Sequence, residues 1–184
     1  MNSPLIPDHE IRDSVVGGLP PAEFKAAFRQ HPAGIAVITA DDGSGPVAMT
    51  ASSVFSVSAE PPVLVFSISN QSSAAPTLLE AETLVVHMLT ADNLNLATLA
   101  ATSGIDRFAD TSLWDRLPSG EPYYVDAHAW IRGRVIDQMR IGDSTVVAVH
   151  ALESSVPDDA SSAHPLVYHN RTWHQLSSQS VIFS

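Results

Sequence analysis

Residues 45–66 read GPVAMTASSVFSVSAEPPVLVF, a segment rich in valine, phenylalanine, serine and threonine. β-Branched and aromatic residues favour extended backbone, and Glu60-Pro61-Pro62 interrupts the segment as a turn would. The pattern therefore predicts two strands, over residues 46–58 and 63–69, joined by a short connection.

The same pattern of β-branched runs separated by turn residues continues on both sides of this segment. The run at 41–45, DDGSG, has the composition of a hairpin turn, and Asn170-Arg171 is expected to form another tight turn. Further strands are expected at residues 34–40, 83–89, 124–138, 144–152, 165–168 and 172–176, and helices at 21–30, 74–81 and 92–102. Strands joined by short turns, with few helices between them, indicate a mainly β, antiparallel barrel and argue against a doubly wound sheet.

The chain has 184 residues, which is enough for one hydrophobic core. Residues 1–20 mix prolines, glycines and charges without a period, so we expect a flexible N-terminal arm there. Residues 21–177 are expected to form the single domain, and residues 178–184 a C-terminal tail.

The charge of the chain excludes several classes of partner. Its formal net charge is −11, with only nine lysines and arginines, whereas nucleic-acid binding needs a basic surface. No apolar run approaches the roughly 18 residues of a membrane span, and residues 1–18 lack the basic start and apolar stretch of a signal peptide. We therefore expect a cytoplasmic protein with no nucleic-acid or membrane partner.

Cysteine is absent, which removes thiolate nucleophiles, iron–sulfur ligation and cysteine-based zinc sites. The sequence also lacks the glycine-rich dinucleotide fingerprint, the P-loop, the serine nucleophile elbow and the HExxH zinc motif. We expect no metal site among the side chains, and any redox chemistry has to come from a cofactor.

Two segments have the chemistry of a ligand site. Small residues around Thr50, Ser52 and Ser53 would let a flat, polar-edged ring lie against the backbone, although the same composition suits an ordinary strand. Ser72 and Ser73 precede a predicted helix, whose first N–H groups attract phosphate. A simple helix cap would account for these two serines as well.

Four segments, taken in order, resemble the flavin reductase-like family, the reductase components of two-component flavin monooxygenases. They are FRQHPAGIAVIT at 28–39, the stretch at 50–66, DRFA at 106–109, and PLVY at 165–168 followed by WHQL at 173–176. The resemblance covers residues 24–176. It implies a split β-barrel homodimer that binds FMN, or FAD, and takes hydride from NADH or NADPH.

The resemblance also implies positions for the ligands. Residues implied to bind the flavin are Thr50, Ala51, Ser52, Ser53, Ser67, Ile68, Ser69, Ser72, Ser73, Val86, His87, Arg107 and Phe108. In this set Ser72 and Ser73 hold the phosphate, whereas Arg107 and Phe108 belong to a loop that covers the ring. Residues implied to lie by the nicotinamide are Val47, Gly142, Asp143 and Ser144. No catalytic residue is identified.

Two positions depart from the family pattern. His87 stands where the family usually has asparagine, and Ser144 stands where it usually has a histidine beside the nicotinamide. Serine lacks the imidazole's reach and stacking face, which weakens the positioning of the hydride donor. The resemblance therefore implies an NAD(P)H-dependent flavin reductase that supplies a partner monooxygenase. A flavin-binding carrier, sensor or partner protein with weak nicotinamide turnover is the alternative, and a related split barrel for haem, a pyridoxal-type phosphate or deazaflavin F420 is a third.

Overall fold

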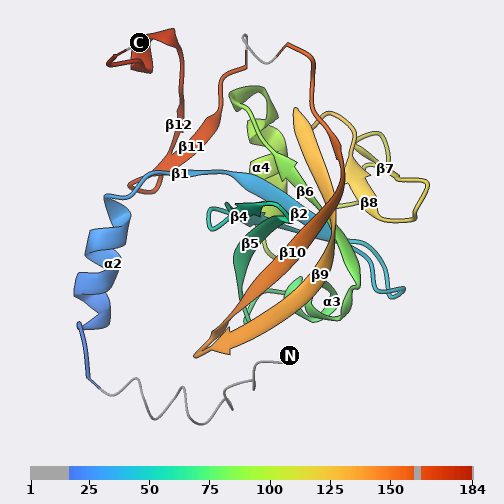
Figure 1. The fold of residues 1–184 in the computed structure, drawn as a ribbon, viewed down its shortest axis with the longest axis horizontal. Coiled ribbons are helices and arrows are strands. Elements are labelled where there is room, and N and C mark those ends of the chain that lie inside the picture. Colours follow the sequence, from blue (N-terminus) through green and yellow to red (C-terminus); the bar gives the residue numbers. More distant parts are fainter. Residues whose placement is uncertain (1–16, 160–162, 184) are drawn as a thin grey trace.

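A curled antiparallel sheet forms the body of the protein in the computed structural model, which describes residues 17–159 and 163–183 (Figure 1). Its strands are β2 (Ala36–Ala40), β3 (Val47–Ala51), β4 (Phe55–Ala59), β5 (Pro62–Ser69), β6 (Thr83–Met88), β9 (Ala129–Ile141) and β10 (Ser144–Ser155). They are ordered β3-β2-β6-β9-β10-β5-β4. This arrangement confirms the mainly β, antiparallel class. The expected N-terminal arm lies outside the described residues up to position 16.

Smaller elements surround this sheet. β1 (Ala33–Gly34), β11 (Leu166–His169) and β12 (Thr172–Gln175) form a three-stranded sheet, and β7 (Trp114–Arg116) pairs with β8 (Pro122–Tyr124). The helices are α2 (Pro21–Arg29), α3 (Ala75–Glu80) and α4 (Leu94–Ala101), with short 3₁₀ turns η1 (Ala91–Asn93) and η2 (Ser178–Ser180). No helix in the described part of the chain is long and apolar enough to cross a membrane.

The single strand predicted over residues 46–58 is wrong, because the chain there forms two strands. β3 ends at Ala51 and β4 begins at Phe55, and the two lie at opposite edges of the seven-stranded sheet. Composition could not reveal this break, since serine and valine fit the crossing segment as well as a strand. The curled sheet is therefore split where residues 52–54 cross from one edge to the other.

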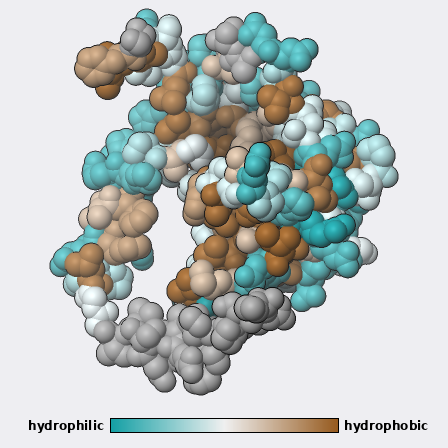
Figure 2. Space-filling model, in the orientation of Figure 1, coloured by the Kyte–Doolittle hydropathy of each residue, from teal (hydrophilic) through white to brown (hydrophobic). Residues whose placement is uncertain are grey.

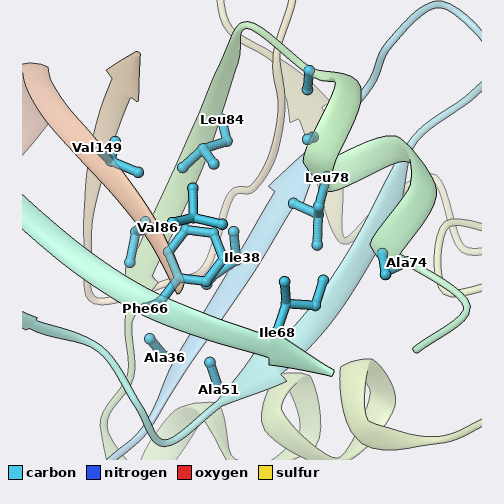
Figure 3. Close-up of a cluster of buried hydrophobic side chains, with 14 of the residues drawn as sticks. Ala36, Ile38, Ala51, Phe66, Ile68, Ala74, Leu78, Leu84, Val86 and Val149 are labelled. Carbon is cyan, nitrogen blue, oxygen red and sulfur yellow. The ribbon is translucent and has the colours of Figure 1, made fainter. Parts of the chain in front are cut away.

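Both faces of the central strand β2 are covered. On the inside of the curl, Ile38 packs in a cluster with Phe66 and Val86 (Figure 3). On the other face, Val37 belongs to a second cluster with Leu96 of α4. Every residue of β2 is consequently buried, which explains why its sequence is a continuous apolar run instead of an alternating one.

Gly133 of β9 marks a close approach between β9 and β10. A Cβ atom there would collide with the Val149 side chain and would lie 2.9 Å from the carbonyl oxygen of His150. The β9–β10 ladder has an irregularity on either side of this contact. Glycine thus permits the two long strands to bend together over the core.

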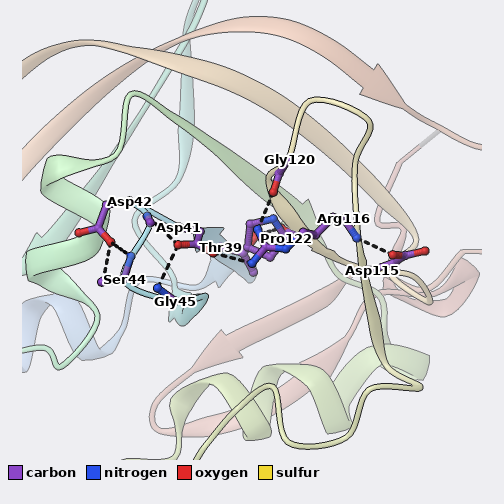
Figure 4. Close-up of polar contacts among 10 residues, drawn as sticks. Thr39, Asp41, Asp42, Ser44, Gly45, Asp115, Arg116, Gly120 and Pro122 are labelled. Carbon is purple, nitrogen blue, oxygen red and sulfur yellow. Dashed lines mark hydrogen bonds and ion pairs between the residues drawn. The ribbon is translucent and has the colours of Figure 1, made fainter.

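Polar contacts fix the β2–β3 turn against the β7–β8 hairpin (Figure 4). Asp41 accepts hydrogen bonds from the Gly43 and Gly45 N–H groups at 2.8 and 3.1 Å and forms an ion pair with Arg116. Arg116 also donates to the carbonyl oxygen of Gly120 at 2.6 Å. The expected hairpin at residues 41–45 is confirmed. So is the tight turn at Asn170-Arg171, where φ is 48° and 63°.

Candidate functional site

A polar groove lies at the split in the sheet, between β3 and the end of β5. Its volume is about 280 Å³. The predicted residues that line it are Thr50, Ala51, Ser52, Ser53, Ser67, Ser69 and Ser72. β3 pairs only with β2, and β4 leaves β5 after Val65. Within the described residues, two strand edges therefore face this groove and offer backbone groups to a ligand.

Two hydroxyls of the groove are already engaged within the protein. The Thr50 hydroxyl donates to the carbonyl oxygen of Ala97 in α4 at 2.6 Å. The Ser53 hydroxyl accepts from the Ser67 N–H at 3.0 Å and donates to the Ser67 carbonyl oxygen at 3.1 Å. These contacts hold the groove walls together, so ligand contacts from Thr50 and Ser53 are limited to the remaining lone pairs of their oxygens.

A second hollow, of about 380 Å³, continues the groove and contains an arginine. Both hollows are lined by Thr50 and Ser72, and the second adds Ser73, Gly104 and Arg107. The Arg107 guanidinium donates to the Thr102 carbonyl oxygen at 2.8 Å and to the Ser73 hydroxyl at 3.4 Å.

One donor of this guanidinium has no partner. Among the described residues, the buried Nε atom of Arg107 has no hydrogen-bond partner. A buried polar group without a partner is costly in a folded protein unless a ligand or water satisfies it. The hollow thus holds a guanidinium beside two serines, which is a donor set that suits a phosphate group.

The helix behind Ser72 and Ser73 contributes less than the sequence suggested. α3 has only six residues, and the Ser72 hydroxyl accepts a 3.4 Å hydrogen bond from the Ala74 N–H. So short a helix has little dipole. The positive charge at this end of the groove comes from Arg107.

The turn between β9 and β10 borders the groove on the β5 side. Ser144 lies opposite Ser69 in the β10–β5 ladder, and the Asn70 N–H donates to the carbonyl oxygen of Asp143 at 2.9 Å. Gly142 has a positive φ of 57°, as a tight hairpin turn requires. The predicted residues 142–144 therefore gather beside the groove.

Val47 does not join them. It lies at the other end of β3, opposite Ala40 in the ladder, and packs against the buried core. The prediction that placed Val47 with the nicotinamide residues is not supported by this position.

The structure does not bring Val86 and His87 to the groove, which corrects the prediction for both. Each side chain is completely buried. His87 Nδ1 lies 2.9 Å from the carbonyl oxygen of Val37, and Nε2 accepts a 3.1 Å hydrogen bond from the Tyr124 N–H. Burial lowers the pKa of His87 to about 4, so the ring is a neutral link between strands.

Phe108 is also a core residue, and its buried side chain does not line the groove. It stacks on Tyr124 with ring centroids 5.5 Å apart and contacts the edge of Trp114 at 5.0 Å. The Tyr124 hydroxyl donates to the carbonyl oxygen of Arg107 at 3.0 Å, and burial raises the pKa of Tyr124 to about 12. Through this hydrogen bond, the stacked rings of Phe108 and Tyr124 hold the backbone of Arg107 in place. The side chain of Ile68 is likewise buried in the core, although its neighbours Ser67 and Ser69 face the groove.

Several lining residues were not anticipated from the sequence. They are Met49, Gln71, Ala100, Ala101, Ser103 and Gly104. Most come from the end of α4 and the turn after it, which approach the groove only through packing against β3. No local pattern marks them, because their role depends on a contact between distant segments.

The residues present fit a flavin mononucleotide. A groove with two strand edges suits the heteroatoms of a flat ring, and the adjoining hollow with Arg107, Ser72 and Ser73 suits its phosphate. The groove and the adjoining hollow share the lining residues Thr50 and Ser72, so one ligand could occupy both.

Comparison with known proteins gives a consistent assignment. The flavin reductase like domain family matches residues 28–177. NADH:FMN oxidoreductase from Rhodococcus qingshengii is 40% identical over 178 residues, covering 94% of this chain and 91% of that protein. A flavin reductase domain protein from Arthrobacter sp. FB24 is 32% identical, with a TM-score of 0.81, over 88% of this chain and 99% of that one.

A further solved structure is BorF, the flavin reductase component of a bacterial two-component tryptophan halogenase. It is 27% identical, with a TM-score of 0.75, over 85% of this chain and 98% of that one. The family match, the sequence identity and the shared fold agree over nearly the same residues. This chain therefore belongs to the flavin reductase-like family.

Proposed function

We propose that this protein is an NADH:FMN oxidoreductase. The observation that carries the proposal is the Arg107 guanidinium, which lies beside Ser72 and Ser73 at the end of a groove suited to a flat ring. The 40% identity to an NADH:FMN oxidoreductase supports the same activity. When bound, FMN would accept a hydride from NADH, and uptake of one proton completes its reduction while NAD⁺ is released.

The chain's own residues would bind and orient the reactants. Arg107, Ser72 and Ser73 would hold the phosphate, and the strand edges at Ser52 and Ser69 would contact the ring. The turn at residues 142–144 would limit how the nicotinamide lies over the ring. Its Ser144 offers a hydroxyl in place of an imidazole, so orientation there rests more on the shape of the groove.

The experiment is an FMN titration followed by anaerobic addition of NADH. We expect saturable FMN binding and bleaching of the flavin absorbance at a catalytic rate with NADH, and NADPH is tested in parallel. Failure to bind FMN would refute the proposal. Binding with bleaching only by dithionite would favour the carrier or sensor alternative, which the relatives named as oxidoreductases do not favour.

We further propose that the reduced flavin serves a separate flavin-dependent monooxygenase. BorF, a relative of this chain, is the reductase component of a two-component enzyme. The test is coupled turnover, in which this protein and NADH replace chemically reduced FMN for a candidate oxygenase.

A homodimer is the proposed assembly. The outer face of β4, β5, β10 and β9 presents apolar residues in neighbouring rows, namely Phe55, Val65, Met139, Ile141, Val146 and Ala148. Ser67 and Ser69 of the groove lie in the same rows, so a second copy on this face would also enclose the site. Sedimentation should give a dimer, and Met139→Glu should weaken it by placing a charge in the interface.

A further inference from the structure

A third hollow, of about 390 Å³, opens at one end of the curled sheet, beside the start of β11. Its lining comes from the same end of β2, β5, β6, β9 and β10. It shares no lining residue with the groove or with the hollow that contains Arg107. Leu64 of the first core cluster and Leu89 and Leu166 of the second line it and are buried. This space, which we call the apolar hollow, therefore lies where the two core clusters meet.

The lining of the apolar hollow carries no charge within the described residues. It is made of aliphatic and aromatic side chains, prolines and a glycine, with hydroxyls only from Ser56 and Ser58. Phe55, which also lines it, remains 62% exposed. A charged ligand would lose its hydration here without gaining a partner. The hollow therefore fits an uncharged, apolar occupant, and exposed apolar surface of this kind marks an interaction site.

The C-terminal tail begins beside the apolar hollow. The Leu176 N–H donates to the carbonyl oxygen of Pro165 at 3.1 Å, and Pro165 lines the hollow. The next residues form the turn η2, in which the Ser180 N–H donates to the Ser177 carbonyl oxygen at 2.9 Å and the Ser177 N–H donates to the Ser180 hydroxyl at 3.1 Å. Beyond this capped turn the tail stands apart from the body, at the upper left of Figure 1.

The end of the tail is apolar and uncovered. Val181, Ile182 and Phe183 are 59%, 84% and 92% exposed, and Figure 2 shows this hydrophobic end at the upper left. Residues 176–184 read LSSQSVIFS and contain no charged residue. Three consecutive apolar side chains with so little contact to their own chain are expected to be buried against another molecule. An uncharged apolar segment matches the chemistry of the apolar hollow.

We propose that residues 181–183 of the tail insert into the apolar hollow of a second copy of this chain. Docking in the hollow of its own chain would require the capped turn to open, whereas docking in a second copy leaves the turn as it is. Phe55 links the two surfaces, because it lines the hollow and belongs to the apolar face proposed for the dimer.

The inference rests on the proposed homodimer and does not depend on the bound flavin. In a two-fold dimer the same surfaces of both copies are used, so each copy gives one tail and receives one. The exchange fills both apolar hollows and buries both tail ends. It therefore makes the tail a part of the dimer interface.

The test measures the Kd of the dimer of the full-length chain by sedimentation. Ile182→Asp/Phe183→Asp places two charges at the end of the tail, where both side chains are exposed in the single chain, so folding should not change. Loss of the apolar contacts of two tails should raise the Kd about a hundredfold. Val125→Asp/Val156→Asp is the matched control, since both valines are exposed and line neither the groove nor the apolar hollow. Its Kd should equal that of the wild type.

Ser56→Asp tests the hollow side of the contact. Ser56 lies opposite the buried Leu64 in the β4–β5 ladder and lines the hollow, so a charge there should also raise the Kd, by about tenfold or more. Added to the tail variant it should have no further effect, because the tail has already left the hollow.

Three results would overturn the inference: an unchanged Kd in the tail variant, an equal rise in the valine control, or rises that multiply in the combined variant. FMN reduction by NADH would uphold the proposed function in each of these cases. A wild type that sediments as a monomer would overturn both the homodimer and the exchange of tails.

Discussion

The two faces of strand β5 differ in chemistry: one is apolar and packs in the core, and the other carries serines that face the groove. Leu64, Phe66 and Ile68 point into the core, whereas Ser67 and Ser69 face the groove. Alternation with a period of two residues places stability and binding on the same strand but on opposite sides. A change on one face should therefore affect folding, and a change on the other should affect the ligand.

The largest effect is expected from Phe66→Ala on the inner face. Phe66 is one of the largest completely buried side chains, and its truncation should lower the free energy of unfolding by about 3–5 kcal/mol. Urea denaturation measures the change. Ser69→Ala is the matched outer-face control and should cost less than about 0.5 kcal/mol. Equal losses in the two variants would contradict the separation of the faces.

The next effect concerns pH and His87, a completely buried titratable residue. Its pKa is about 4 in the folded protein against a reference of 6.5, so the unfolded chain binds the proton more readily. Stability should be complete above pH 6.5 and fall by up to about 3 kcal/mol as the pH drops toward 4. Denaturation at several pH values measures this slope.

His87→Asn provides the comparison for that slope. The variant should be less stable at neutral pH, because the two hydrogen bonds to Val37 and Tyr124 are disturbed. It should also lose this part of the pH dependence. An unchanged slope would show that other groups cause it.

A smaller effect is expected from Arg107→Gln, at the ligand side of the molecule. Loss of the charge-assisted hydrogen bond to phosphate should weaken FMN binding by about tenfold. Riboflavin, which has no phosphate, should bind with unchanged affinity. Fluorescence titration with both flavins is the measurement, and an equal loss for riboflavin would mean that Arg107 supports the fold instead of the phosphate.

The smallest effect is expected from Ser144→His on the outer rim. An imidazole opposite Ser69 should orient the nicotinamide better, raising kcat/KM for NADH by about two- to fivefold, equivalent to about 1 kcal/mol or less. FMN affinity should not change. A lower value would indicate that the histidine obstructs the groove.

Much of the fold could be predicted from local patterns. The turn at residues 41–45, the turn at Asn170-Arg171 and most strands follow from turn residues and β-branched runs. The crossing at residues 52–54 could not be predicted, because those residues fit a strand equally well and only closure of the curled sheet separates its edges.

The site was predictable in part, for a related reason. The serines at 52–53, 67–69 and 72–73 were identified, and the structure brings them together. Val86, His87 and Phe108 were not predictable as core residues, because distant segments bury them. Val86 packs with Ile38 and Phe66, whereas His87 and Phe108 contact Tyr124 of β8. Resemblance to a family identifies which position in the chain corresponds to a family site. It does not show whether the side chain at that position is buried or faces the ligand.

The sequence by itself determined the β class, the turn positions, the acidic charge and the serine-rich composition of the site, since each of these depends on residues that are close in the chain. Tertiary structure alone decided which face of each strand is buried and where the sheet splits. It also decided that Arg107 meets Ser73, 34 positions away, with one donor unpaired. Such contacts between distant residues form only when the core packs, so no local pattern encodes them.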